Sequence, residues 1–169
     1  GVSRHRIADV AVLGALVAGA SALTDPAVPV PDLAGLSAAQ REQPSTYVPH
    51  RNLVFLSLAA AFAEAQGMHD VYYGAQRQDA YGYWDCTPAF ADRLNAVLAL
   101  NRREPVRVHA PFAELSKRDI VRLGLDLGVP YAETWSCYRG GDRPCGACPA
   151  CVERGAAFRS LGVPDPLAA

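Results

Sequence analysis

Four cysteines fall within one short stretch near the C-terminus, residues 137–151 of this 169-residue chain. They follow the pattern Cys-x7-Cys-x2-Cys-x2-Cys, at Cys137, Cys145, Cys148 and Cys151. Thiolates two residues apart on a tight turn can reach one ion, and Gly146 and Pro149 supply residues that favour such turns. Four thiolates complete the tetrahedron that zinc prefers, with Zn–S bonds of about 2.3 Å, and leave no position for water. The spacing therefore predicts a closed, structural zinc site.

The sequence leaves three other uses of these thiols open: an iron–sulfur cluster, redox-active thiols, or a disulfide in an oxidising compartment. The N-terminal "RHR" and apolar "AVLGALVAGASA" resemble a signal peptide, but Asp9 interrupts the approach to the apolar run. That run is shorter than the roughly 20 residues that a membrane span needs. We therefore expect a cytoplasmic protein without a membrane segment, where clustered thiols bind metal. The lone Cys86 is expected to be a small buried residue, with a nucleophilic role as the alternative.

The composition is that of one soluble globular domain. Half of the residues are hydrophobic and 20% are charged, while the net charge is -1 with a pI near 6.5. No overall basic field attracts the chain to nucleic acid or to an anionic membrane.

Predicted strands alternate with predicted helices along the chain, which favours an α/β fold with a Rossmann-like parallel sheet covered on both faces. The strands are expected at 5–14, 70–75 and 106–111, and the helices at 51–67, 88–101, 116–128 and 150–162. Ligands of such sheets bind beyond the carboxyl ends of the strands, so the loops after Gly74 and Ala110 are expected to form a site. The proline-rich segment 23–49 is expected to be a mobile or substrate-covering loop.

Two cations lie where an anionic group would bind. Arg51 stands at the start of a predicted helix, and Lys117 stands in the first turn of another. Either could bind phosphate or carboxylate at a helix N-terminus, although both also suit an ordinary solvated surface position.

The segment "QDAYGYWDC" combines two carboxylates, Asp79 and Asp85, with three aromatic side chains. Aromatic rings can stack on a flat purine-like base while a carboxylate accepts hydrogen bonds from its ring N–H groups. The alternative is a turn that only places its aromatic side chains in the core.

Six motifs occur together in one order: "SALTD", "PSTYVPHRN", "GYWDC", "LSKRDI", "TWSCY" and "CGACPACVER". Together they resemble the 7-cyano-7-deazaguanine synthases, a family of PP-loop (N-type) ATP pyrophosphatases, from about Gly1 to Asp165. The resemblance implies an adenine nucleotide alpha hydrolase-like fold. It also implies ATP-dependent conversion of 7-carboxy-7-deazaguanine and ammonia to 7-cyano-7-deazaguanine (preQ0), the precursor of queuosine.

The resemblance also implies ATP with Mg²⁺ as cofactor, structural zinc on the four cysteines, and a homodimer that binds neither membrane nor nucleic acid. Lys117 is then the expected catalytic residue, and Arg51, Asp79 and Asp85 the expected substrate-binding residues.

Several features depart from the family pattern. The phosphate-binding run S-G-G-x-D-S occurs nowhere in the chain. We therefore expect residues 1–169 to form a single PP-loop ATPase-like domain that lacks its first strand and PP-loop and is inactive alone. His50 stands where the family has glycine in "VPGRN", and Tyr81, Trp84 and Thr87 replace residues of "SGYPDCR". The alternatives are a paralogue acting on a related base, an inactive zinc-stabilised remnant, and a nucleic-acid-binding module.

Overall fold

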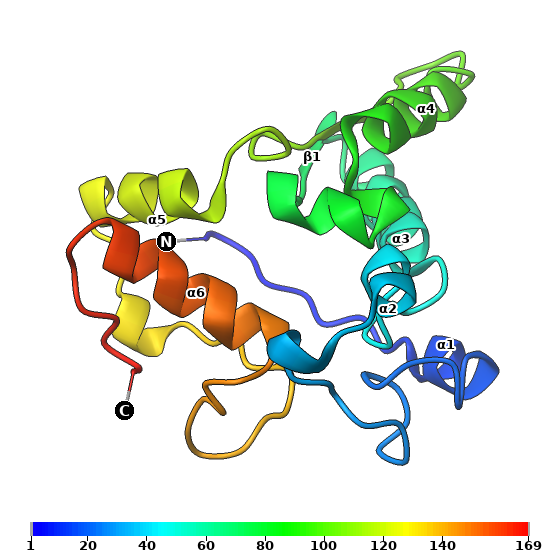
Figure 1. Ribbon diagram of the computed structural model, residues 1–169. Coiled ribbons are helices and arrows are strands. Elements are labelled where there is room, and N and C mark those ends of the chain that lie inside the picture. The colour runs from blue at the N-terminus through cyan, green and yellow to red at the C-terminus, as the bar shows by residue number, and fades with distance from the viewer. Residues whose placement is uncertain (1, 169) are drawn as a thin grey trace.

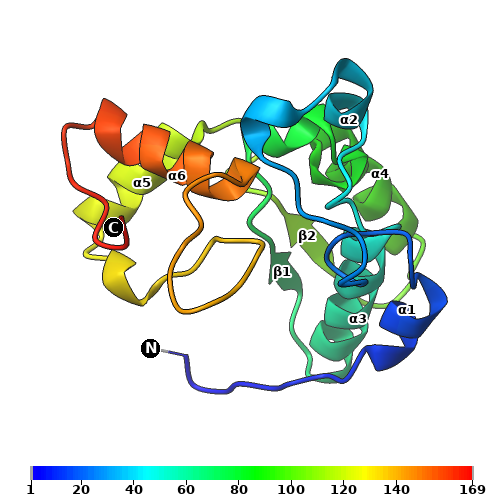
Figure 2. The same cartoon turned by 60° about the horizontal axis from the view of Figure 1, so that its bottom comes forward.

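A parallel pair of short strands, β1 (Asp70–Tyr72) and β2 (Arg107–His109), lies between two groups of helices (Figures 1 and 2). The computed structural model describes residues 2–168, except for the side chain of Arg41. Helix α4 (Pro88–Leu98) connects the two strands, and α3 (Arg51–Ala65) packs beside it on the same sheet. This arrangement confirms the predicted α/β fold with a parallel sheet.

One face of the sheet carries the core. Val71 pairs with Val108, and the two side chains contact an apolar cluster formed by Leu56, Phe90 and Leu94 of the covering helices. Asn95 of α4 adds two hydrogen bonds of 2.8 Å to the backbone of Val108. Because successive strand residues point to opposite faces, the neighbours of these valines face away from the helices.

The opposite face is open in the part of the chain that the structure describes, so the prediction of two covered faces is wrong there. Tyr72 is 68% exposed and stacks on His109, with ring centroids 4.7 Å apart, and Asp70 lies 2.6 Å from the His109 ring. Helices α5 (Lys117–Asp126) and α6 (Pro149–Ser160) pack on each other instead, around Phe158, to one side of the sheet (Figure 2).

The predicted helix boundaries are confirmed where side chains cap them. Thr87 accepts a hydrogen bond from the Phe90 amide before Pro88, and Ser116 forms a capping box with Asp119. Short elements complete the described chain: α1 (Ala11–Leu16), α2 (Ala38–Glu42), η1 (Leu33–Gly35), η2 (Arg77–Tyr81), η3 (Trp84–Cys86) and η4 (Tyr131–Glu133).

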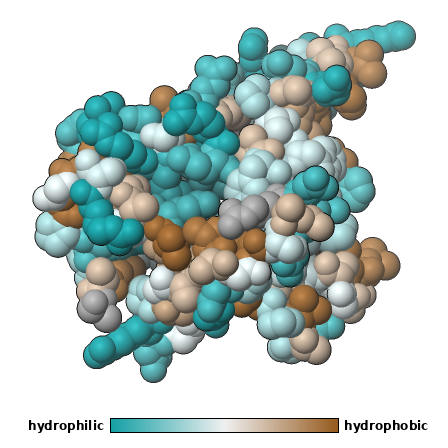
Figure 3. Space-filling view, in the orientation of Figure 1, coloured by the Kyte–Doolittle hydropathy of each residue, from teal (hydrophilic) through white to brown (hydrophobic). Residues whose placement is uncertain are grey.

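The strand predicted at 5–14 is wrong. Residues 2–10 run along the surface without pairing, and the Ala11 amide at the start of α1 donates to the Asp9 side chain at 2.8 Å. A strand needs a neighbour for its backbone groups, and none lies beside this segment within residues 2–168. The apolar side chains of Val12 and Leu16 in α1 are exposed. In Figure 3, hydrophobic surface is visible at the right side of the molecule, where Figure 1 shows α1. No described helix combines the length and apolar content needed to cross a membrane.

Candidate metal centre and substrate site

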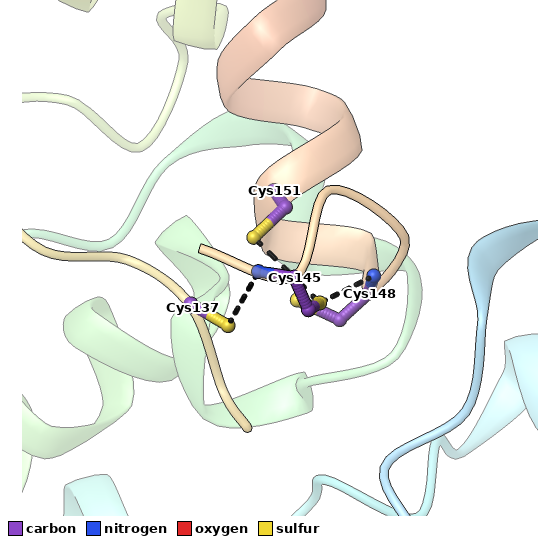
Figure 4. A group of neighbouring side chains, drawn as sticks. All are labelled: Cys137, Cys145, Cys148 and Cys151. Carbon is purple, nitrogen blue, oxygen red and sulfur yellow. Dashed lines mark hydrogen bonds between the residues drawn. The ribbon is translucent and has the colours of Figure 1, made fainter. Parts of the chain in front are cut away.

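The four clustered cysteines converge on one point (Figure 4). Their sulfur atoms all lie within 4.8 Å of one another. A tetrahedral ion with metal–sulfur bonds of about 2.3 Å would hold its sulfurs about 3.8 Å apart, so only a small contraction is needed. These residues, Cys137, Cys145, Cys148 and Cys151, could hold a metal ion.

Local backbone geometry explains why these sulfurs meet. Gly146 has φ = 70°, a left-handed conformation that glycine adopts without a Cβ clash. This turn lets the Cys148 amide donate to the Cys145 sulfur at 3.3 Å, while the Cys145 amide donates to the Cys137 sulfur at 3.4 Å. Helix α6 begins directly after Cys148, which brings Cys151 in its first turn within 4.0 Å of the Cys145 sulfur.

Electrostatics at this centre favours thiolate at one sulfur and thiol at another. Burial raises the pKa of Cys145, but hydrogen bonds from the backbone at Cys148 and Ala147 outweigh it and lower that pKa to about 6. Burial and hydrogen bonding with neighbouring sulfurs raise the pKa of Cys151 to about 12. A bound cation would favour the thiolate form of every ligand, so metal binding and proton release are coupled here.

The loop that carries the cysteines also forms hydrogen bonds with the proline-rich segment 23–49. The Leu33 amide donates to the Ala147 carbonyl at 3.0 Å, and Arg139 donates to the Val30 carbonyl at 2.9 Å and to Asp32 at 2.6 Å. Val30 packs against the buried cysteines. These contacts hold the middle of the segment in place, although it was expected to be mobile. Its expected role as a substrate cover remains a prediction.

The loops that follow β1 and β2 meet, as expected. The Arg77 amide donates to the Leu115 carbonyl at 3.1 Å, and the Lys117 amide donates to the Gln78 side chain at 3.1 Å. The Lys117 ammonium lies 2.9 Å from the carboxylate of Glu153 on α6. The predicted catalytic lysine is therefore held between the loop after β1 and the helix that follows the cysteines.

The two predicted substrate-binding aspartates have different surroundings. Asp79 accepts from the amide and side chain of Gln76, at 3.2 and 3.0 Å. Asp85 is 1% exposed, and one of its oxygens accepts from the Asn52 amide at 3.1 Å, in the first turn of α3. Its other oxygen has no hydrogen-bond partner among the described residues. Asp85 thus stabilises the start of α3 in this structure, and its contact with substrate stays a prediction.

Arg51 is the first residue of α3, and its charge acts on Tyr83, Cys86 and Tyr138. Burial, then the charges of Asp79 and Asp85, raise the pKa of Cys86 to about 12. A thiol with this pKa is not a nucleophile near neutral pH, which agrees with the expectation of a small buried residue.

Two tyrosines connect the metal centre to this region: Tyr83, one of the aromatic residues of "QDAYGYWDC", and Tyr138, to which the sequence assigned no role. Tyr83 is buried, its hydroxyl hydrogen-bonds to Thr46, and it interacts electrostatically with Tyr138. Tyr138 directly follows a cysteine ligand and interacts with the charges of Asp79 and Arg51. For Tyr138, the signal in the sequence was the tyrosine that ends "TWSCY".

Two of the departures from the family pattern contact each other. His50 adopts φ = 54°, a conformation that glycine accommodates more easily. Its ring packs edge-on against Trp84, with centroids 5.6 Å apart, and the Trp84 indole donates to the Tyr47 hydroxyl at 2.8 Å. The ring contact holds a backbone conformation that is unfavourable for histidine.

Comparison with known proteins decides the family. The family model described as "Queuosine biosynthesis protein QueC" matches residues 1–162. The chain belongs to the QueC family. The QueC relatives include proteins named 7-cyano-7-deazaguanine synthase in Thermoplasma acidophilum, 45% identical over 88% of this chain, and in a Nostoc species, 44% identical over 88%. Another QueC relative with this name, from Psychromonas ingrahamii, is 39% identical over 97% of the chain.

The matched region spans 63% of the Thermoplasma relative, 67% of the Nostoc relative and 72% of the Psychromonas relative. The predicted family resemblance is confirmed, and it extends along nearly all of this QueC chain.

Proposed function

We propose that this chain carries the base-binding and metal-binding part of an enzyme that makes 7-cyano-7-deazaguanine. The observation that supports this most is the 45% identity, over 88% of the chain, to a relative named for that reaction. In the proposed reaction ATP activates the carboxylate of 7-carboxy-7-deazaguanine, and ammonia displaces the activating group to give an amide. A second activation of the amide oxygen lets it leave, which produces the nitrile.

The residues present suit parts of this chemistry. Lys117 is the only lysine of the chain, and with Arg51 it would neutralise the phosphate or carboxylate oxygens of the activated intermediate. The ammonium of Lys117 would exchange its partner Glu153 for these oxygens when substrate binds. Asp79 would accept hydrogen bonds from the base.

We propose zinc as the metal of the cysteine centre. Four thiolate donors with no open position suit a structural zinc ion, which would hold the cysteine loop and take no part in the reaction. Metal analysis of the purified chain tests this, with one zinc per chain expected. Iron accompanied by acid-labile sulfide would contradict it.

The nucleic-acid-binding alternative is disfavoured by the pairing of the basic residues beside the cysteines. Arg139 is paired with Asp32, and Arg154 is paired with Asp165. Of the three arginines that would form a basic stripe, only Arg143 lacks an acidic partner within the described residues.

ATP phosphates need backbone N–H groups aimed at the anion, and the S-G-G-x-D-S run that supplies them in PP-loop proteins is absent from these 169 residues. We therefore expect the chain alone to form no nitrile. Fusing it to the part of the Thermoplasma relative that lies outside the match should restore nitrile formation, measured by mass spectrometry.

In this fusion Lys117→Met should reduce the rate at least a hundredfold, whereas Arg102→Met, at an exposed position, should not. A fusion that folds and binds ATP but makes no nitrile would contradict the proposed function. Nitrile formation by the unfused chain would contradict the requirement for a PP-loop. A homodimer is also proposed, and sedimentation analysis would contradict it by finding only monomer.

A further inference from the structure

A recess lies between the segment 22–30 and the cysteine loop, and no role has been assigned to it so far. Its volume is about 690 Å³, within the range of pockets that take small molecules. Residues 22–25 of the motif "SALTD" form one wall, and Tyr138 with Arg139 forms another. Two of the sequence motifs, separated by more than a hundred residues, thus face the same space.

The walls of this recess suit a flat, hydrogen-bonding ring. Pro26, Val28 and Pro29 contribute apolar surface, and the ring of Tyr138 is 36% exposed. Asp25 lies on the wall and accepts from the Ala27 amide through Oδ1 at 2.8 Å. Its other carboxylate oxygen has no hydrogen-bond partner within residues 2–168 and is left to accept from a ligand.

Tyr138 joins this recess to the residues predicted to act on the substrate. It interacts with Tyr83 and with the charges of Arg51 and Asp79. By contrast, Asp79 accepts from Gln76, and Asp85 is 1% exposed and bonds at the start of α3. Of these three aspartates, Asp25 is the one that lines the recess.

We propose that the recess binds the heteroaromatic base of the substrate, with the ring against Tyr138 and its N–H groups donating to Asp25. The identity of this base as a 7-deazapurine rests on the proposed function. The cysteine loop then has a second task beyond holding metal, because it places one wall of the base site.

The test is calorimetric binding of 7-carboxy-7-deazaguanine to the metal-loaded 169-residue chain and to three variants. Asp25→Asn should weaken binding at least tenfold. Tyr138→Ala should weaken it about five- to 150-fold, the effect expected from losing one base–aromatic stack. Tyr138→Phe keeps the ring and should restore binding to within about threefold of the unaltered chain.

Matched controls separate a local effect from general damage. Asp142→Asn changes an exposed aspartate on the cysteine loop, and Tyr72→Ala removes an exposed tyrosine on the sheet, so neither should alter binding. Metal content should stay at the unaltered value in every variant, which a collapsed cysteine loop would not allow.

Binding that is unchanged in both Asp25→Asn and Tyr138→Ala would overturn the inference while leaving the proposed function intact. Nitrile formation by the fusion enzyme, with Asp25→Asn leaving its KM unaltered, would overturn it in the same way. Absence of base binding together with absence of nitrile formation would overturn both proposals.

Discussion

The part of the molecule that contains α5 and α6 and the part that contains α3 are stabilised by different contacts. Helices α5 and α6 enclose Phe158, which is 1% exposed, whereas on α3 Phe62 remains 44% exposed. The outer face of α3 and residues 2–10 border an open cleft of about 1100 Å³ rather than a packed core. The α5–α6 side closes on itself, while the α3 side leaves apolar surface in contact with water.

Hydrogen bonds and an ion pair hold much of the α5–α6 side together. Arg154 forms two hydrogen bonds with Asp165, of 2.7 and 2.8 Å, and donates to Thr134 and Tyr131. Its guanidinium also lies over the rings of Tyr131 and Phe158. With the cysteine centre at the other end of α6, these contacts fix a region whose apolar core is small. The Arg154–Asp165 pair and the clustered cysteines thus take the place of core volume on this side only.

Metal removal should have the largest effect on the difference in stability between the α5–α6 side and the α3 side. Structural zinc contributes about 10–16 kcal/mol of binding free energy in zinc-finger peptides, so Cys148→Ser or chelation should unfold the cysteine loop and the start of α6. Hydrogen exchange should then speed up in residues 130–165 and change little in α3, α4 and the strands. Uniform exchange across the chain would show that the two sides are not separable.

Replacing one phenylalanine on each side with alanine should lower the free energy of unfolding by unequal amounts. Phe158→Ala leaves a cavity in a closed core and should cost about 3–5 kcal/mol of unfolding free energy. Phe62→Ala removes a half-exposed ring and should cost below about 1 kcal/mol. Chemical denaturation of both variants measures the difference, and equal losses would contradict the packing described.

Acid should weaken the α5–α6 side first. Burial raises the pKa of Asp165, but hydrogen bonds from Arg154 outweigh it and hold that pKa below its ordinary value of 3.8. The resulting stabilisation is present above pH 3.8 and is lost as the pH falls through the lower, folded-state value. Arg154→Met should remove the loss of stability that occurs as Asp165 is protonated. Arg122→Met disrupts the more exposed pair with Asp119, and this variant should still lose stability as Asp165 is protonated. Identical pH profiles in melting experiments would contradict this role for the pair.

The smallest effect is expected at His50. His50→Gly relieves a left-handed backbone but loses the ring contact with Trp84, so the net change should stay within about 1 kcal/mol. Adding Trp84→Pro restores the proline found at this position in the family. In that background, His50→Gly should be more favourable than it is as a single substitution. A double-mutant cycle measures this coupling, and strict additivity would show that the two positions are independent.

Features set by neighbouring residues could be predicted from the sequence. The cysteine spacing, the Thr87 cap and the Ser116–Asp119 capping box all depend on contacts a few residues apart. The segment 5–14 could not be predicted in this way, because an apolar run forms a strand only beside a partner strand.

The candidate site was predictable only in part, for the same reason. Charged residues after strands pointed to Lys117 and Asp79, whose surrounding loops do meet. The approach of Tyr138 to Tyr83 joins positions more than fifty residues apart, and no local pattern encodes that contact. The burial of Asp85 against Asn52 likewise depends on how η3 packs on α3.

If a metal-held cysteine loop completes a site for a deazapurine base, as proposed, base binding must depend on the metal. Calorimetry with 7-carboxy-7-deazaguanine tests this on the zinc-loaded chain, on the same sample after chelation, and after zinc is returned. Binding of one base per chain should be present with zinc, lost on chelation and restored by zinc. A metal-free chain that binds the base as tightly as the zinc-loaded chain would contradict the claim.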